Sequence, residues 1–99
     1  MTFGGHDVIL ARDGNDTVCA GNGNDLVIGA NGNNTAFGEA GHDLLLGGGS
    51  PDQLYGGDGR DLLLGGASGD LLDGGPHTDI CLGGPGVDTF VACEFAGNP

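Results

Sequence analysis

Length, composition and charge already limit what this chain of 99 residues can be. It contains 24 Gly and 4 Pro, and 14 acidic residues against two arginines and no lysine give it a formal net charge of −12. A single domain of this size needs stabilisation beyond its hydrophobic core, and the scarcity of basic residues argues against a nucleic-acid partner, because phosphate groups are held by clustered Lys and Arg.

Aspartates recur at intervals of nine residues from Asp7 to Asp88, with Asn34 in place of one member. From Thr2 to Val91 the sequence therefore divides into ten nonapeptide units without an insertion. The first six residues of each unit are rich in Gly, Asn and Asp, which tolerate positive φ, and the last three are mostly strand-forming. Each unit thus predicts a turn and a short strand, and the ten strands are expected at residues 8–10, 17–19, 26–28, 35–37, 44–46, 53–55, 62–64, 71–73, 80–82 and 89–91.

The eighth position of each unit is the natural core position, because successive strand side chains point to opposite faces. A strand of three residues cannot stand alone, so successive units must wind into a coil in which each strand pairs with one a full turn away. The expected core column is Ile9, Val18, Val27, Ala36, Leu45, Leu54, Leu63, Leu72, Cys81 and Phe90.

The most regular unit is Gly56-Gly57-Asp58-Gly59-Arg60-Asp61-Leu62-Leu63-Leu64, which reads Gly-Gly-x-Gly-x-Asp-x-aliphatic-x. This nonapeptide resembles the calcium-binding repeat of RTX, or hemolysin-type, proteins. The resemblance implies an all-β fold, a parallel β-roll (β-solenoid) of two facing parallel sheets with two nonapeptides per turn and about five turns. We expect a calcium-binding β-roll at residues 2–91 and a C-terminal cap or tail at 92–99.

With two units per turn, the sixth positions stack into two ladders on opposite edges. Stacked carboxylates repel each other unless a cation lies between them, and calcium suits that position because it takes six to eight oxygen ligands in tolerant geometry. Five rungs leave four gaps on each edge, or up to about eight sites between turns. The odd edge, formed by the odd-numbered units, carries Asp7, Asp25, Asp43, Asp61 and Asp79, and the even edge carries Asp16, Asn34, Asp52, Asp70 and Asp88.

The resemblance also implies the ligands. In that family each ion lies between adjacent loops and binds the sixth-position Asp of both loops and backbone carbonyls from the first four positions. The nine aspartates of the two ladders are therefore expected to bind metal, with carbonyls of Gly21, Gly23, Gly38, Gly41, Gly56, Gly57, Gly59 and Gly74. The expected function is non-enzymatic calcium binding by a module that folds on binding Ca2+ and belongs to a larger exported protein.

The odd edge is expected to bind calcium better than the even edge. Glycine fills the fourth position of its units except at His77, which we expect to distort its loop and weaken the gap between Asp61 and Asp79. The even edge includes Asn34, which offers a carbonyl oxygen but no charge. Its other departures from the pattern are Ser50, Pro51 and Ser68.

Other chemistries fit the sequence less well. His6 and His42 share a repeat position, but they are 36 residues and therefore two coil turns apart, too far to bind one zinc ion. Ser50 and Ser68 do not lie in a Gly-x-Ser-x-Gly elbow, so no catalytic residue is predicted. The open alternatives are a cation-independent solenoid with a structural or adhesive surface, and an ice-binding face built on an interrupted row of Thr.

Three cysteines leave one unpaired if a disulfide forms. Cys81 lies in the core column and Cys93 follows the last repeat, where the chain must turn back to cover the open end. We expect a Cys81–Cys93 bridge, the alternative being two buried thiols, while the role of Cys19 stays open. A disulfide and weak calcium sites favour a secreted protein. The first ten residues lack the pattern of a secretory signal, and no apolar run reaches the ~18 residues of a spanning helix.

The outward positions seven and nine differ between the two sheets. In the even units they mix polar and apolar residues, whereas in the odd units they are uninterrupted aliphatics. A contiguous aliphatic surface of this kind marks an interface. We therefore expect a homodimer or a packed domain over Val8, Leu10, Leu26, Ile28, Leu44, Leu46, Leu62, Leu64, Ile80 and Leu82.

Overall fold

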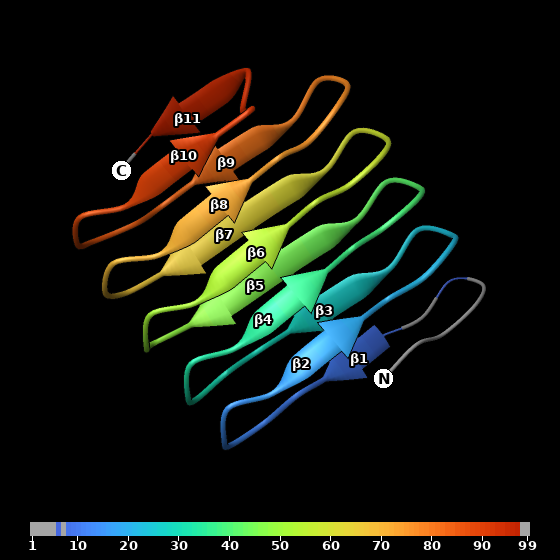
Figure 1. Ribbon diagram of the computed structural model, residues 1–99. Coiled ribbons are helices and arrows are strands. Elements are labelled where there is room, and N and C mark those ends of the chain that lie inside the picture. Colours follow the sequence, from blue (N-terminus) through green and yellow to red (C-terminus); the bar gives the residue numbers. More distant parts are fainter. Residues whose placement is uncertain (1–5, 7, 98–99) are drawn as a thin grey trace.

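The computed structural model describes residue 6 and residues 8–97, with side chains to residue 94 (Figure 1). All the regular secondary structure of these residues is β-strand, since turn-forming residues separate each short aliphatic triplet from the next. The strands are β1 (Val8–Leu10), β2 (Thr17–Cys19), β3 (Leu26–Ile28), β4 (Thr35–Phe37), β5 (Leu44–Gly48), β6 (Gln53–Tyr55), β7 (Leu62–Gly66), β8 (Leu71–Asp73), β9 (Ile80–Leu82), β10 (Thr89–Val91) and β11 (Phe95–Gly97).

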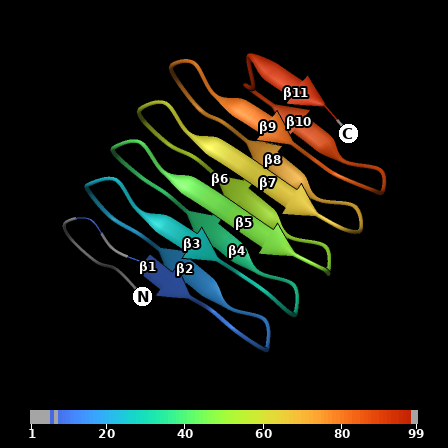
Figure 2. The same ribbon diagram turned by 180° about the vertical axis from the view of Figure 1, so that it is seen from behind.

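The strands form two facing parallel sheets, which Figures 1 and 2 show from opposite sides. The six-stranded sheet has the order β1-β3-β5-β7-β9-β11 and the five-stranded sheet the order β10-β8-β6-β4-β2. Leu45 pairs with Leu63, 18 residues later, so one turn of the coil takes two nonapeptides. The expected parallel β-solenoid of about five turns is confirmed, and no helix in the described part of the chain is long and apolar enough to cross a membrane.

The core is the expected column of eighth-position side chains between the sheets. Nine of its ten members are buried, and the tenth, Phe90, is partly buried and packs against them. Phe90 lies in β10, the last strand of the five-stranded sheet, which has a neighbour on one side only. Ala20, at the first position of a unit, is fully buried and was not predicted.

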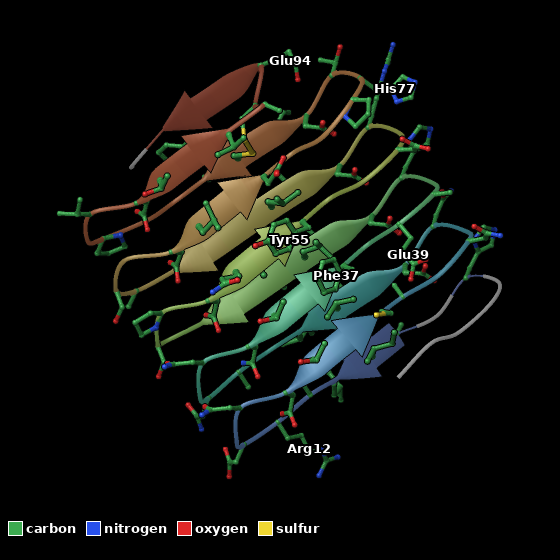
Figure 3. The ribbon with its side chains drawn as sticks, viewed as in Figure 1. Arg12, Phe37, Glu39, Tyr55, His77 and Glu94 are labelled. Carbon is green, nitrogen blue, oxygen red and sulfur yellow. A yellow bond between two sulfur atoms is a disulfide. The ribbon has the colours of Figure 1, made fainter. Side chains whose placement is uncertain are left out.

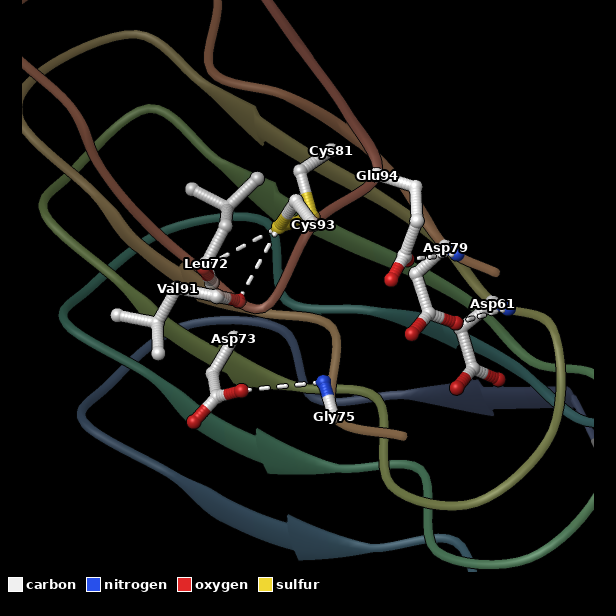
Figure 4. Close-up of a disulfide and its surroundings, with 9 residues drawn as sticks. All are labelled: Asp61, Leu72, Asp73, Gly75, Asp79, Cys81, Val91, Cys93 and Glu94. Carbon is white, nitrogen blue, oxygen red and sulfur yellow. Dashed lines mark hydrogen bonds between the residues drawn. A yellow bond between two sulfur atoms is a disulfide. The ribbon is translucent and has the colours of Figure 1, made fainter. Parts of the chain in front are cut away.

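The C-terminal segment adds an eleventh strand where ten were expected. β11 pairs with β9, with Phe95 opposite Ile80, so this last turn is 15 residues long instead of 18. A disulfide joins Cys81 of β9 to Cys93, the pairing that the sequence suggested, with an S–S distance of 2.02 Å (Figure 4). The segment beyond the repeats is thus attached to the six-stranded sheet by both main-chain pairing and a covalent bond.

The outer faces of the two sheets differ as expected. On the six-stranded sheet Val8, Leu10 and Ile80 are 69%, 50% and 41% exposed, and the other predicted aliphatics are partly buried by their neighbours. On the five-stranded sheet the rings of Phe37 and Tyr55 stack with their centroids 4.9 Å apart (Figure 3). Cys19 has no disulfide partner and is partly buried beside Phe37 in the strand register.

Candidate metal centre

The sixth-position aspartates are fixed by main-chain hydrogen bonds between turns. Asp43 directly precedes β5, and its carbonyl accepts the N–H of Leu62 one turn later, at 2.9 Å. The N–H of Asp43 donates to Oδ1 of Asp61 at 2.8 Å, and the N–H of Asp61 donates to Oδ1 of Asp79 at 2.7 Å. The even edge repeats this arrangement, since the N–H of Asp52 donates to Oδ1 of Asp70 at 2.8 Å. Each carboxylate is therefore held in register with the turn before it.

The second carboxylate oxygen has no such partner. Hydrogen bonding would normally offset the cost of removing a carboxylate oxygen from water, and an unsatisfied buried oxygen is expensive. Such atoms in a native fold call for an ion or a water molecule. Within the described residues, the buried Oδ2 atoms without a hydrogen-bond partner include those of Asp16, Asp43, Asp52, Asp61, Asp70 and Asp79.

Glycines at the first position leave open the space that these oxygens face. A Cβ placed on Gly38 would lie 2.7 Å from Oδ2 of Asp43 and 2.8 Å from the carbonyl oxygen of Gly56 in the next turn. A Cβ on Gly56 would meet Oδ2 of Asp61 at 2.6 Å and the carbonyl of Gly74 at 2.8 Å. A carboxylate oxygen of one turn and a carbonyl oxygen of the next therefore converge on the same space.

Glycine at the fourth position has a second role. Gly41 has a φ of +110°, and a Cβ there would clash with the carbonyl oxygen of Gly23 one turn below. Gly59 has a φ of +98°, and a Cβ there would likewise clash with the carbonyl oxygen of Gly41. A side chain at Gly41 or Gly59 would therefore meet the carbonyl of the neighbouring turn, so glycine at these two positions permits close stacking as well as the backbone conformation.

Burial strongly raises the pKa of three of the ladder carboxyl groups. Burial, together with the charge of Asp25, raises the pKa of Asp43 to about 7. Burial, together with the charges of Asp43 and Asp79, raises the pKa of Asp61 to about 8. On the even edge burial and the charges of Asp52 and Asp88 raise the pKa of Asp70 to about 7. The protein groups alone do not compensate these charges, so the ladders favour protons or cations.

Asn34 changes one rung of the even ladder. Its Oδ1 accepts the N–H of Asp16 at 3.1 Å, as an Asp would. Its Nδ2 donates to the carbonyl of Gly32 at 3.2 Å and lies 2.8 Å from the Cβ position of Gly29, where the other rungs place Oδ2. Burial raises the pKa of Asp52 above its ordinary value, and hydrogen bonds with Asn34 offset part of this rise. At this rung a hydrogen-bond donor stands where a cation would need an oxygen.

The other departures from the repeat have smaller effects on the ladders. His77 adopts a φ of +78°, in the left-handed region that glycine occupies elsewhere, and the Asp61–Asp79 hydrogen bond of 2.7 Å is preserved. The expected distortion of the loop is therefore absent at this bond. Ser68 also adopts a positive φ, of +75°, and its hydroxyl donates to the carbonyl of Gly49 at 2.8 Å. Ser50 does not adopt a positive φ, so its loop differs from the others.

The histidines of the odd edge bond to the main chain of neighbouring turns. Nδ1 of His6 accepts the N–H of Asn24 at 2.8 Å, Nδ1 of His42 accepts the N–H of Arg60 at 3.0 Å, and Nδ1 of His77 accepts the N–H of Gly59 at 2.9 Å. In the described part of the chain, no three side chains of His, Cys, Asp or Glu converge as metal ligands. A metal between turns would therefore use carboxylates and main-chain carbonyls, the oxygen donors that calcium prefers.

Glu94 is a candidate ligand that the nine-residue pattern missed. Its Oε1 accepts the N–H of Asp79 at 2.8 Å, as a ladder carboxylate does (Figure 4). The only sequence signal was an acidic residue directly before a short apolar segment. Of the predicted metal ligands, Asp7 lies outside the described residues, and the odd ladder shows Asp25, Asp43, Asp61 and Asp79. The even ladder contains Asp16, Asp52, Asp70 and Asp88 on either side of Asn34.

Comparison with known families agrees with this geometry. The model of the RTX calcium-binding nonapeptide repeat matches the chain in four copies, at residues 4–27, 20–54, 28–63 and 55–90. No match to a curated protein or to a solved structure was found.

Proposed function

The chain belongs to the RTX calcium-binding nonapeptide repeat family, and from this premise we propose that it is a secreted module that folds when calcium binds between its turns. The observation that carries this proposal is the row of buried Oδ2 atoms, such as those of Asp43 and Asp61, that have no hydrogen-bond partner in the described structure. The Oδ2 atoms of Asp43, Asp52, Asp61 and Asp79 face a space that also holds a carbonyl oxygen of the next turn.

The proposed ligands of one inner site illustrate the arrangement. Between the turns of Asp43 and Asp61, Oδ2 of Asp43 and the carbonyl of Gly56 would bind the ion. The carboxylate of Asp61 would complete the anionic set, with the carbonyls of Gly41 and Gly59 as further donors. Six to eight oxygens at about 2.3–2.6 Å satisfy calcium, whereas magnesium requires a stricter octahedron.

Folding and binding are coupled in this proposal because the metal-free roll stacks charges with little to offset them. The formal charge of −12 acts against a compact chain, and the ladder carboxyls resist ionisation when buried, as the pKa of Asp61 at about 8 illustrates. Binding free energy of a ligand that recognises only the folded state adds directly to folding stability.

Circular dichroism with a chelator and with calcium tests the coupling. In excess EDTA at neutral pH the chain is expected to lose its β signal, and calcium is expected to restore it, with magnesium at the same concentration as the control. A full β signal in EDTA that does not respond to calcium would favour the alternative, a cation-independent solenoid with a structural or adhesive surface.

Secretion is a separate part of the proposed function. The Cys81–Cys93 disulfide supports it, because such bonds persist in oxidising compartments. Membership of a larger exported protein is proposed from the family, and the calcium module contributes binding to it. Fractionation of the source cells, with antibody against the repeat, would contradict secretion if the protein stayed in the cytoplasm.

The aliphatic face of the six-stranded sheet is proposed to bind a second copy of the chain. A groove of about 630 Å³ runs over this face, with Val8, Leu26, Leu44, Leu62 and Ile80 among its lining residues. The molecule measures 33 × 30 Å in its two longest directions, which leaves room for the ~800 Å² per partner of a standard interface.

A further inference from the structure

The odd ladder continues past the last nonapeptide. The matched repeats end at residue 90, yet β11 extends the six-stranded sheet and places Glu94 next to Asp79 in the strand register. Oε1 of Glu94 accepts the N–H of Asp79 at 2.8 Å, while Oδ1 of Asp79 accepts the N–H of Asp61 at 2.7 Å. Figure 4 shows the three carboxylates in a row. Glu94 therefore takes the position of a further rung, although its spacing from Asp79 is 15 residues.

The space between Asp79 and Glu94 has the donors of an inner gap. Asp79 is fully buried, with 0% of its surface exposed, and its Oδ2 has no hydrogen-bond partner within residues 6 and 8–97. A Cβ on Gly74 would lie 2.8 Å from Oδ2 of Asp79 and 2.7 Å from the carbonyl oxygen of Ala92. In the inner gap, a Cβ on Gly38 would lie 2.7 Å from Oδ2 of Asp43 and 2.8 Å from the carbonyl oxygen of Gly56. The same pair of oxygens thus faces the same opening at the end of the stack.

The disulfide holds the segment that carries Glu94. Cys81 is fully buried in the core column, and Cys93, bonded to it, directly precedes Glu94. Figure 4 shows the disulfide beside the row of carboxylates. The pairing of β11 with β9 fixes the other side of Glu94. Burial raises the pKa of Asp79, and the charge of Glu94 adds to this rise, so the two carboxylates repel each other when no cation is bound.

We propose that Asp79, Glu94 and the carbonyl of Ala92 form a further calcium site that closes the odd ladder, and that the Cys81–Cys93 disulfide positions Glu94 for it. The proposal rests on the calcium-binding function proposed above. It assigns the terminal ligand to a residue outside the repeat, on a turn that is three residues shorter than the others.

The test compares Glu94→Gln with the wild-type chain by calorimetric titration of calcium. Gln keeps an oxygen that can accept the N–H of Asp79 but loses the charge, so β11 is expected to stay in place. Glu94→Gln is expected to bind one calcium ion fewer per chain. Asp58→Asn is the matched control, because Asp58 is exposed and outside both ladders, and it is expected to bind as many ions as the wild type. Cys81→Ala/Cys93→Ala is expected to lose the same single site.

A direct measurement on the wild-type chain keeps the proposal testable if a variant does not fold. The ¹³C resonance of the Ala92 carbonyl is expected to shift on calcium addition, as is that of Gly56 in an inner gap. A shift at Gly56 but not at Ala92, or an unchanged ion count in Glu94→Gln, would overturn the terminal site and leave the proposed function intact. A wild-type chain that binds no calcium would overturn both.

Discussion

The rung at Asp43 and the rung at Asn34 occupy equivalent positions on opposite edges and differ in one atom. Oδ1 of each accepts a main-chain N–H from the preceding turn, that of Asp25 at 2.9 Å and that of Asp16 at 3.1 Å. The second polar side-chain atom of Asp43, Oδ2, is buried and has no hydrogen-bond partner among the described residues. The corresponding atom of Asn34 is Nδ2, which donates to the carbonyl of Gly32. The ladder hydrogen bond therefore holds the turns in register without charge, and the second oxygen is available for a cation.

Protonation should remove most of this difference, because a neutral Asp resembles Asn. The pKa of Asp43 rises from 3.8 to about 7 and that of Asp61 to about 8, so the folded, metal-free chain holds more protons than the unfolded chain between these values. Stability from these groups is complete below pH ~3.8 and is lost as the pH rises through 7 to 8. In EDTA the β signal in circular dichroism is expected to be strongest near pH 4 and weakest near pH 8. A signal that grows with pH would contradict this linkage.

Replacing Asp43 by Asn converts the odd rung into a copy of the even one. Asp43 adjoins two gaps, so Asp43→Asn is expected to weaken two calcium sites by about tenfold or more each, or ~1.4 kcal/mol per site. Calorimetric titration measures the change, and Asp58→Asn serves as the control of equal charge. Equal calcium binding by both variants would show that carbonyls supply enough ligands without this carboxylate.

The reverse change, Asn34→Asp, is expected to have a smaller and opposite effect. It supplies the missing oxygen beside Asp16 and Asp52, so calcium affinity should rise at the even edge by a fewfold, limited by the altered loop of Ser50. In EDTA the same variant should be less stable at pH 8 than the wild-type chain, because one more carboxylate joins the stack. Thermal unfolding with and without calcium measures both effects, and a variant that gains stability in EDTA would contradict the explanation.

The smallest effect on calcium is expected at the outer face, which belongs to neither ladder. Replacing Leu44, Leu46, Leu62 and Leu64 with Thr should leave the calcium stoichiometry unchanged, because these side chains point away from the core and the loops. Association of two copies, measured by sedimentation with calcium present, should be lost. A wild-type chain that stays monomeric at high concentration would remove the homodimer proposal.

Prediction from the sequence succeeded along the nine-residue period and failed where the period stops. The nine-residue interval was sufficient for the strand register and for the core column as far as Cys81. It could not predict β11, since Phe95-Ala96-Gly97 continues no repeat and its turn is shorter. Glu94 was missed for the same reason.

The nine-residue pattern also could not predict the conformation of single residues. His77 stands where most units have glycine, yet it adopts a positive φ of +78°. Its ring accepts a hydrogen bond from the N–H of Gly59 there. The orientation of the Asn34 amide depends on which neighbours donate and which accept, and these become known only once the turns are stacked. Hydrogen bonds between turns determine these conformations, and no single nonapeptide contains such bonds.

The direction of the ladder hydrogen bonds makes the two ends of the roll unequal. Each rung's N–H donates to the carboxylate of the following turn, as Asp43 does to Asp61 and Asp79 to Glu94. Truncation from the N-terminus, one turn at a time, would leave every remaining ladder N–H with its carboxylate acceptor, while it would remove main-chain acceptors such as the carbonyl of Asp43 from the N–H of Leu62. Truncation from the C-terminus would take the acceptor from the newly terminal rung at each step. Shortened versions of this protein should therefore keep the hydrogen bonds of their carboxylate ladders after deletions at the start and lose one from each shortened ladder after deletions at the end.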